Sequence, residues 1–583
     1  MLSNPIAEQR VDSAPRTNLD DYLAAFADES QPFLTYYTFA EDRSVQTETF
    51  TRGQFLRLAR QAAACLVAQG CEPGDRVLHA MSRNHCADLA YRFGAVMVGA
   101  VPVTVNWQAD DTARVLYKIA ATQPRLILTE RAFDPGTLAA CRQTHPDLSM
   151  VFVENLGTSP ELPQNQFLRD EDPEHSRIII FTSGTTGQPK GVQLPYRSYA
   201  TNRATFEALL DIRPEDRFAT VIVNPLHHTN STAITDWALR RPGSHLHLIE
   251  RYSTPYWRIL ADLADQAYDR IVAPTVSRHF DFLAELRETD RLPVSMDVLG
   301  PAMGRIDFLI GSAPVGPTTI HRLQEFAGRI PTVRFGSTET CLQVLGIPRH
   351  LGETQRLACF ERGWNHSWQG LPTCGYYIGR PTHPFTECRI VRSITHGEPG
   401  FLEDQEAGKP GYLITRGENV MSGYVGNPEA TAAALPEGWY TGLRDVAFRL
   451  RNPEDDAWDY YWMSRDSALL IRGGANYAYD QINRELADFL AAQYGLDPVN
   501  FDLAVVGLRL ESEHEDTCCV TLELKDGIAA DTRDAIAATF VATARATVGK
   551  GAKPDRLLLA PVLRNFKGAI LVSDLKEQFR NSL

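Results

Sequence analysis

Glycines, hydroxyl side chains and one lysine occupy a loop at 182–191, between two short apolar runs. Glycine lets backbone N–H groups converge on an anion, the hydroxyls add donors, and the lysine adds a positive charge. The loop lacks the glycine and lysine spacing of a Walker A motif. We interpret it as a phosphate cradle, although its composition alone also suits a polar hairpin tip. The residues that would hold the phosphate are Thr182, Ser183, Gly184, Thr185, Thr186 and Lys190.

Two segments further along the chain contain residue types that suit a bound nucleotide. The first reads Gly-Ser-Ala-Pro at 311–314, and the second reads Phe-Gly-Ser-Thr-Glu at 335–339. An aromatic ring gives a purine a flat apolar partner, and a carboxylate gives a hard cation an oxygen ligand. Taken alone, Glu339 would most simply be a surface acid.

In their order along the chain, the loop and these two segments resemble the signatures of the adenylate-forming superfamily, which includes acyl-CoA synthetases, peptide-synthetase adenylation domains and luciferases. The resemblance extends over nearly the whole chain, and a block at 411–431 matches a part of the family that we interpret as structural. It implies that Thr338 reaches the α-phosphate and that Glu339 holds Mg²⁺. The implied adenine contacts are Ser312, Ala313, Pro314, Phe335, Gly336 and Ser337.

The family lines its acyl pocket with a segment that falls here on His227, His228 and Asn230. Either histidine would gate the pocket, and a hydrogen-bonded core histidine is the alternative. His228, Asn230 and Asp236 together hint at a polar group on the substrate. An aromatic stretch at 364–368 either roofs the pocket or packs on its own sheet.

The C-terminal motifs depart from the family pattern. The aspartate that binds the ribose in the family is displaced here by two residues, to Asp445. A bulged turn would accommodate the two-residue insertion. The alternative is that Asp445 is only an acidic residue of a helix or turn. Arg465 is the implied ribose or phosphate contact. Gly473 and Gly474 stand where the family lines its pantetheine tunnel, in a stretch that is also similar to fatty-acyl-AMP ligases.

The closing lysine of the family is best matched by Lys567, which precedes its glycine instead of following it. The resemblance implies that Lys567 meets the substrate carboxylate and the α-phosphate, with a solvated surface lysine as the alternative. Lys553 is the next candidate for this role. The implied catalytic residues are thus Lys567, Thr338 and Glu339.

The elements that must position these residues alternate between helices and strands. Apolar positions at 55–67 recur at helical spacing after Thr51, and 76–81, 101–105 and 126–128 are short β-rich runs. Such alternation predicts a largely parallel sheet, with ligands gathered where its strands end. We therefore predict an α/β fold in which residues 1–464 form a large multi-layer region. Residues 465–583 would form a small mobile α/β domain with a hinge near 465–467.

The composition is that of a globular protein, with 583 residues, 44% of them hydrophobic, and a net charge of −14. A chain this acidic is not expected to bind nucleic acid. No apolar run is long enough for a membrane span, and the first residues show no signal or transit peptide. The 10 scattered cysteines suggest reduced thiols in the cytoplasm. Homodimers are common among the proteins that this chain resembles.

The resulting function is the ATP- and Mg²⁺-dependent activation of a small carboxylic acid to acyl-AMP, with release of pyrophosphate. The acyl group would then pass to a thiol, most simply that of CoA. An alternative acceptor is a carrier-protein thiol, an amine or an internal hydroxyl. The displaced Asp445 and Lys567 also leave open an inactive nucleotide-binding homologue.

Overall fold

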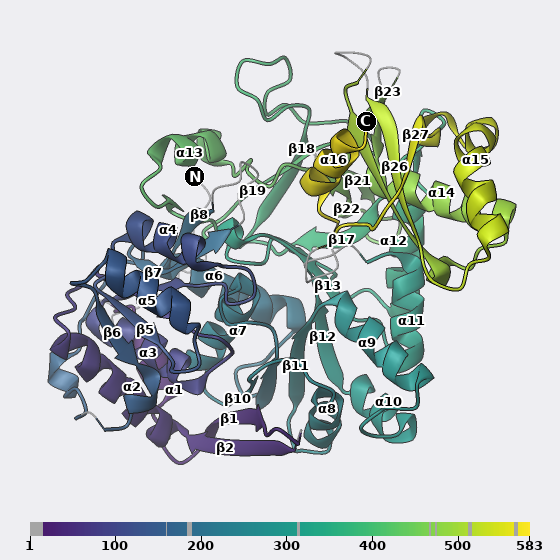
Figure 1. The fold of residues 1–583 in the computed structure, drawn as a ribbon. Coiled ribbons are helices and arrows are strands. Elements are labelled where there is room, and N and C mark those ends of the chain that lie inside the picture. The colour runs from purple at the N-terminus through teal and green to yellow at the C-terminus, as the bar shows by residue number, and fades with distance from the viewer. Residues whose placement is uncertain are drawn as a thin grey trace. The chain divides into compact units, whose positions relative to one another are not determined.

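The computed structural model describes residues 16–42, 44–158, 160–182, 189–311, 315–465, 468–472, 475–510, 516–564 and 570–583 (Figure 1). The chain forms two compact units. The larger unit consists of Met1–Ala358, Ile378–Arg389 and Ile414–Gly442, and the smaller unit consists of Cys359–Tyr377, Ile390–Leu413 and Leu443–Leu583. The boundary at 464 and the hinge stay predictions, and residues 466–467 lie outside the described residues.

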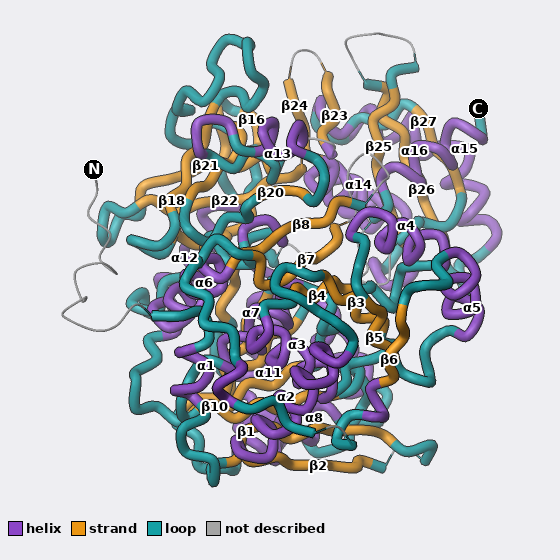
Figure 2. The backbone as a smooth tube through the Cα atoms, turned by 90° about the vertical axis from the view of Figure 1, so that its left-hand side faces the viewer, coloured by secondary structure: helices purple, strands orange, loops and turns teal. Residues whose placement is uncertain are grey.

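The first sheet of the larger unit is parallel at its centre, with strands in the order β20-β8-β7-β4-β3-β5-β6, and Figure 2 shows this order running from β20 to β6. Its strands are β3 (Arg76–Ala80), β4 (Val101–Thr104), β5 (Leu126–Thr129), β6 (Ser149–Phe152), β7 (Ser176–Thr182), β8 (Lys190–Pro195) and β20 (Gly423–Tyr424). The helices between them are α2 (Arg52–Ala68), α3 (Cys86–Val98), α4 (Thr112–Thr122) and α5 (Pro135–Thr144). Thr51 caps α2 through a reciprocal capping box with Gln54.

A second sheet of the larger unit contains five adjacent parallel strands, β10, β9, β11, β12 and β13. Their bounds are β9 (Phe218–Ile222), β10 (Ser244–Ile249), β11 (Arg270–Thr275), β12 (Ile306–Ile310) and β13 (Thr332–Phe335). The flanking strands are β1 (Pro32–Phe39), β2 (Val45–Thr51), β14 (Leu345–Gly346) and β17 (Tyr376–Pro381). The helices of this part are α1 (Asp20–Ala25), α6 (Tyr196–Leu210), α7 (Thr229–Leu239), α8 (Tyr256–Ala264), α9 (Ser277–Glu288), α10 (Met296–Gly304), α11 (Pro317–Ala327) and α13 (Pro428–Ala434).

Helix α7 has no exposed face. Every one of its residues is buried, and it packs against β9, β10 and α6. A helix that is buried all round has no polar stripe for solvent, so its polar residues must find partners inside the protein. This makes α7 a rigid support for the predicted acyl segment at its amino end.

The smaller unit contains an antiparallel strand group and a C-terminal α/β layer. The first group consists of β21 (Asp445–Arg451), β22 (Trp458–Arg465) and the first residues of β19 (Gly411–Arg416), whose last three residues belong to the larger unit. The C-terminal sheet consists of β25 (Phe501–Leu508), β26 (Thr517–Leu524) and β27 (Arg556–Leu559). Its helices are α14 (Tyr479–Tyr494), α15 (Ala530–Thr547) and α16 (Val572–Asn581). The other elements that lie wholly or partly in this unit are α12 (Glu353–Trp364), β15 (Ser367–Trp368), β16 (Leu371–Pro372), β18 (Glu387–Val391), β23 (Leu469–Arg472) and β24 (Ala475–Ala478).

The predicted α/β class is confirmed, and so are the helix predicted after Thr51 and the strands predicted at 76–81, 101–105 and 126–128. The C-terminal layer has its own core, in which Leu486, Val505, Val520 and Phe540 are buried together. Within the described part of the chain, no helix is both long and apolar enough to cross a membrane.

Candidate active site

Three predicted site segments follow directly after the carboxyl ends of strands in the larger unit. The loop at 183–188 follows β7, the turn at 312–314 follows β12, and the motif at 335–339 begins at the last residue of β13. Strands β12 and β13 are parallel neighbours, with Ile310 opposite Val333, so the turn and the motif leave the same edge. This is the edge at which open α/β sheets bind their ligands.

The cradle opens from an antiparallel pair of strands. Thr182, the last residue of β7, stands opposite Lys190, the first residue of β8. The ammonium of Lys190 lies 5.0 Å from the centre of the Tyr424 ring, a cation–π distance. The predicted contacts Ser183, Gly184, Thr185 and Thr186 lie outside the described residues.

Tyr424 connects the cradle to the predicted metal residue. Its strand β20 pairs with β8, and its hydroxyl donates a hydrogen bond of 3.2 Å to Glu339 Oε1. Tyr440 is a second buried tyrosine near the Glu339 carboxylate. Burial raises the pKa of both tyrosines, so both hydroxyls stay protonated. The Tyr424 hydroxyl therefore donates to Glu339 as a neutral group, and it joins Glu339 to the strand that pairs with the cradle strand β8.

A tight turn after β13 fixes Thr338 and Glu339. A Cβ at Gly336 would lie 1.5 Å from the carbonyl oxygen of Leu342, so only glycine fits there. Cys341 and Leu342 follow with positive φ values of 45° and 85°. Such strained backbone persists only where its surroundings hold it. Here the buried Asn419 amide donates to the carbonyls of Thr340 and Gln343, at 2.9 and 3.1 Å.

The predicted acyl segment is buried at the amino end of α7. His227 packs edge-on against Trp107 with ring centres 5.5 Å apart, and His228 is the residue preceding the helix. Asn84 holds the segment, because its side chain accepts from the Leu226 amide at 2.8 Å and donates to two backbone carbonyls. Asn230, in the first turn, accepts a hydrogen bond of 2.6 Å from Arg334.

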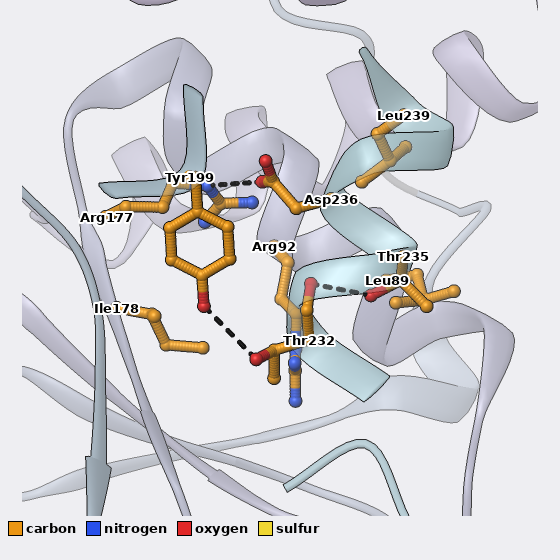
Figure 3. A pocket seen from close by; sticks show the side chains of 9 residues that line it. All are labelled: Leu89, Arg92, Arg177, Ile178, Tyr199, Thr232, Thr235, Asp236 and Leu239. Carbon is orange, nitrogen blue, oxygen red and sulfur yellow. Dashed lines mark hydrogen bonds and ion pairs between the residues drawn. The ribbon is translucent and has the colours of Figure 1, made fainter. Parts of the chain in front are cut away.

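The middle of α7 borders a small pocket (Figure 3). Its volume is about 10 Å³, which is room for about one water molecule and not for an acyl group. Beside it, the Asp236 carboxylate accepts from Arg177 at 3.0 Å and from Tyr22 at 2.6 Å. Asp236, one of the three residues that hinted at a polar substrate group, is thus committed to a buried ion pair that holds α7.

In the smaller unit, Asp445 begins β21 and is buried. The Trp462 indole donates to its carboxylate at 2.8 Å, and Arg465 lies 3.6 Å from the same oxygen. Arg444 has a positive φ of 52°, and the pairing of β21 with β22 shifts between Val446 and Ala447. Backbone irregularity of the kind that the two-residue insertion predicts therefore borders Asp445.

The remaining predicted positions divide into two groups. Lys553 is described, and its carbonyl accepts a hydrogen bond from Arg472. Trp364 packs on Tyr376 and lies 3.6 Å from the Arg484 guanidinium, so it contacts its own unit. The predicted residues that lie outside the described part are Ser312, Ala313, Pro314, Gly473, Gly474 and Lys567.

The residues at the cradle fit Mg²⁺ as a nucleotide-bound cation. Among the described residues, no cluster of three or more His, Cys, Asp or Glu side chains could hold a metal by itself. Mg²⁺ does not need one, because it keeps several waters and combines one or two carboxylates with substrate phosphates. Glu339 supplies a carboxylate beside the phosphate cradle, and only one of its oxygens accepts from Tyr424.

A family model described as "AMP-binding enzyme" matches residues 29–425, which is more than half of the chain. The chain belongs to the AMP-binding enzyme family. Among curated relatives, sulfoacetate–CoA ligase of Cupriavidus necator is 25% identical over 67% of this chain and 68% of its own. Indoleacetate–CoA ligase of Aromatoleum aromaticum is 24% identical over 81% of this chain and 83% of its own.

Among solved structures, the fold is similar to o-succinylbenzoate CoA synthetase (MenE) of Bacillus subtilis. The complex of MenE with its acyl-adenylate intermediate has a TM-score of 0.72 at 18% identity, covering 96% of this chain and 98% of MenE. Its complex with ATP and magnesium has a TM-score of 0.69 at 19% identity, covering 95% and 99%. These matches confirm the fold, and membership in the AMP-binding enzyme family confirms the resemblance predicted from the motifs.

Tyr424, Tyr440, Asn419 and Arg334 are site residues that the sequence reasoning missed. The first three lie in or beside the block interpreted as structural, and the aromatic residue of the Gly423-Tyr424 pair was the available signal. Their roles depend on partners more than 75 positions away or on strand pairing, which the motifs alone do not show.

Replacement of Gly336 by alanine tests the turn. We expect Gly336→Ala to lower the free energy of unfolding by about 3 kcal/mol, because the backbone must shift to relieve the contact with Leu342. Gly352→Ala is the matched control, since the nearest atom to its added Cβ is a flexible side-chain atom 3.7 Å away. Its stability should change by less than about 1 kcal/mol in urea unfolding. Equal effects would contradict the close approach.

Proposed function

We propose that this AMP-binding enzyme is an AMP-forming acid–thiol ligase, which activates a carboxylic acid with ATP and transfers the acyl group to CoA. The observation that carries the proposal is the hydrogen bond from the Tyr424 hydroxyl to Glu339, which joins the predicted nucleotide motif to the strand that pairs with the cradle strand β8. Support also comes from relatives that are named as CoA ligases.

In the first step a carboxylate oxygen attacks the α-phosphorus of ATP. One P–O bond forms to the acid, and the bond between the α- and β-phosphates breaks to release pyrophosphate. Because two anions must meet, the site needs fixed positive charge and donors more than covalent help. The loop at 182–187 and Lys190 hold the phosphates, Thr338 contacts the α-phosphate, and Lys567 meets the carboxylate. Mg²⁺ on Glu339 supplies charge neutralisation at the phosphates when bound.

In the second step the CoA sulfur attacks the adenylate carbonyl carbon. A C–S bond forms, the C–O bond to AMP breaks, and the thiol proton is lost. Gly473 and Gly474 line the path of the pantetheine arm. A turn of the C-terminal domain about 465–467 withdraws Lys567 between the steps, which is a gating motion of the kind that limits turnover in many enzymes.

The nucleoside contacts complete the assignment. The turn at 312–314 and Phe335 hold the adenine, with Gly336 and Ser337 in the same motif. Asp445 binds the ribose hydroxyls, and Arg465 binds the ribose or a phosphate. The hydrogen bond from Trp462 keeps the Asp445 carboxylate in one orientation, which favours this role.

Location and assembly complete the proposal. The 10 cysteines are all free thiols, which suits the reducing cytoplasm. We propose that the protein is a homodimer, and light scattering on the purified protein measures its mass.

His227, His228 and Asn230 line the acyl pocket.

The activity test uses purified protein with ATP, Mg²⁺, CoA and panels of short, aromatic and long-chain acids. We expect acid-dependent exchange of pyrophosphate into ATP, and acyl-CoA detected by mass for the best acids. Accumulation of acyl-AMP without a thioester would contradict CoA as the acceptor and favour a carrier protein or another nucleophile. Absence of exchange with every acid would contradict adenylation itself.

Removal of the Tyr424 hydroxyl tests its link to Glu339. We expect Tyr424→Phe to raise the Mg²⁺ concentration for half-maximal exchange by about 10–100-fold, because the carboxylate loses the donor that orients it. The ring that faces Lys190 is retained. Tyr494→Phe, which removes an exposed hydroxyl that bonds Thr539, is the control and should leave the Mg²⁺ dependence unchanged.

The two candidate lysines are separated by alanine substitution. Lys567→Ala should lower pyrophosphate exchange by about 100-fold or more while ATP binding is retained, because a cation that stabilises the transition state is lost. Lys553→Ala should keep nearly full exchange. The reverse pattern would move the role to Lys553.

A further inference from the structure

Arg334 is a buried cation that pairs with no carboxylate among the described residues. It lies in β13 and is only 4% exposed. Its Nη2 atom donates to Asn230 Oδ1 at 2.6 Å, and the guanidinium carbon lies 5.7 Å from the Phe206 ring centre. Among the described residues, Nε has no hydrogen-bond partner and no carboxylate is within ion-pair distance. The turn at 312–314 reads Ser-Ala-Pro and brings no carboxylate by sequence.

Other buried arginines of the larger unit are compensated. Arg52, which also makes no ion pair with the described residues, donates to the carbonyls of Ala25 and Ser244 at 2.7 and 2.8 Å and lies over two aromatic rings. The arginines paired with carboxylates are Arg92 with Asp88, Arg177 with Asp236, Arg240 with Asp21 and Arg241 with Glu207. Within the described part of the chain, Arg334 has one hydrogen-bond acceptor, Asn230, although burying a charge is costly unless it is paired and hydrogen-bonded.

The position of Arg334 points to the acyl group. It directly precedes Phe335, and its Cγ lies 3.7 Å from where a Cβ would stand on Gly311, at the start of the turn after β12. Its acceptor Asn230 belongs to the predicted acyl segment and to the first turn of α7, where the helix dipole favours negative charge. The cation therefore lies among the segments expected to surround the substrate.

The charge persists at neutral pH. Burial lowers the pKa of Arg334 to about 9, and the group remains protonated below that value. A bound anion would restore the interactions that burial removes, and the planar guanidinium can hold a carboxylate through two parallel hydrogen bonds.

We propose that Arg334, oriented by Asn230, binds a second anionic group of the substrate, so that the acid this protein activates is a dicarboxylate or a carboxylate with a sulfonate or phosphonate group. This inference rests on the proposed function and names its substrate class. One carboxylate is activated at the α-phosphate, and the other anion is held by Arg334. The polar substrate group that the acyl segment suggested is then an anion.

The test compares acids that differ only in the second charge. Dicarboxylates of increasing length are paired with their monomethyl esters in the pyrophosphate exchange assay, and a sulfo- and a phosphono-carboxylate distinguish the kinds of anion. For the wild-type protein we expect kcat/KM to favour a dianionic acid over its ester by about 100-fold or more, because the ester leaves the guanidinium unpaired. Arg334→Leu should abolish this preference, mainly by loss of activity on the dianion.

Controls separate recognition from folding. Arg334→Lys keeps the positive charge but lacks the two parallel N–H donors of the guanidinium, and it should restore part of the preference. Arg334→Gln provides a neutral polar variant if the leucine variant does not fold, and thermal unfolding checks each variant. Arg287→Leu, at a half-exposed arginine beside Glu325, should leave the preference unchanged.

Two negative results have different meanings. The role of Arg334 is overturned if the wild-type protein has the same kcat/KM for monomethyl esters as for dianionic acids. It is also overturned if Arg334→Leu keeps the wild-type preference. In both cases the ligase activity stands. If no acid of either kind supports exchange, the proposed function fails, and the substrate class that rests on it fails too.

Discussion

The contact between the Tyr424 hydroxyl and the Glu339 carboxylate joins two parts of the larger unit that are far apart in the sequence. It depends on the pairing of the two-residue strand β20 with β8, in which Tyr424 stands opposite Val192. A slip of one residue would turn the tyrosine to the other face of the sheet and away from both Lys190 and Glu339. The Met421 amide strengthens this register, because it donates to the Glu339 carbonyl at 2.7 Å. The cradle strand and the strained turn at 335–342 are thereby held as one piece.

The distribution of charge follows from the same arrangement. Most buried cations of the larger unit are neutralised inside the protein, as in the pair of Arg177 with Asp236. Lys190 is different, because among the described residues its partner is the face of an aromatic ring and not a carboxylate. A ring stabilises an ammonium without cancelling its charge, so the charge stays available to a phosphate. In a protein with a net charge of −14, local cations of this kind are needed where ATP and an acid meet.

Much of the fold could be predicted from the sequence, because hydrophobic periodicity and capping are local signals. The helix after Thr51 and the strands at 76–81, 101–105 and 126–128 follow from neighbouring residues. The site could be predicted only where one short motif carries it, as at 335–339. Tyr424 meets Glu339 across 85 positions, and Asn419 reaches the turn across 76 or more, so their roles arise from strand pairing. Arg334 did leave a local signal, a charge in the middle of an apolar strand.

A charge in such a strand has a definite physical meaning. Leucine or valine at position 334 would fill the space without desolvating a cation, and replacing buried charges with apolar residues is often neutral or stabilising. The cost of Arg334 is offset only in part by Asn230 and the Phe206 ring. Interactions that are incomplete in the free protein and completed by a ligand contribute to selectivity, because a ligand without the matching group leaves the cation unpaired. Lys190 and Arg334 are alike in this respect, because each is a cation whose described neighbours include no carboxylate. Lys190 would meet a phosphate of ATP, and Arg334 would meet the second anionic group of the acid.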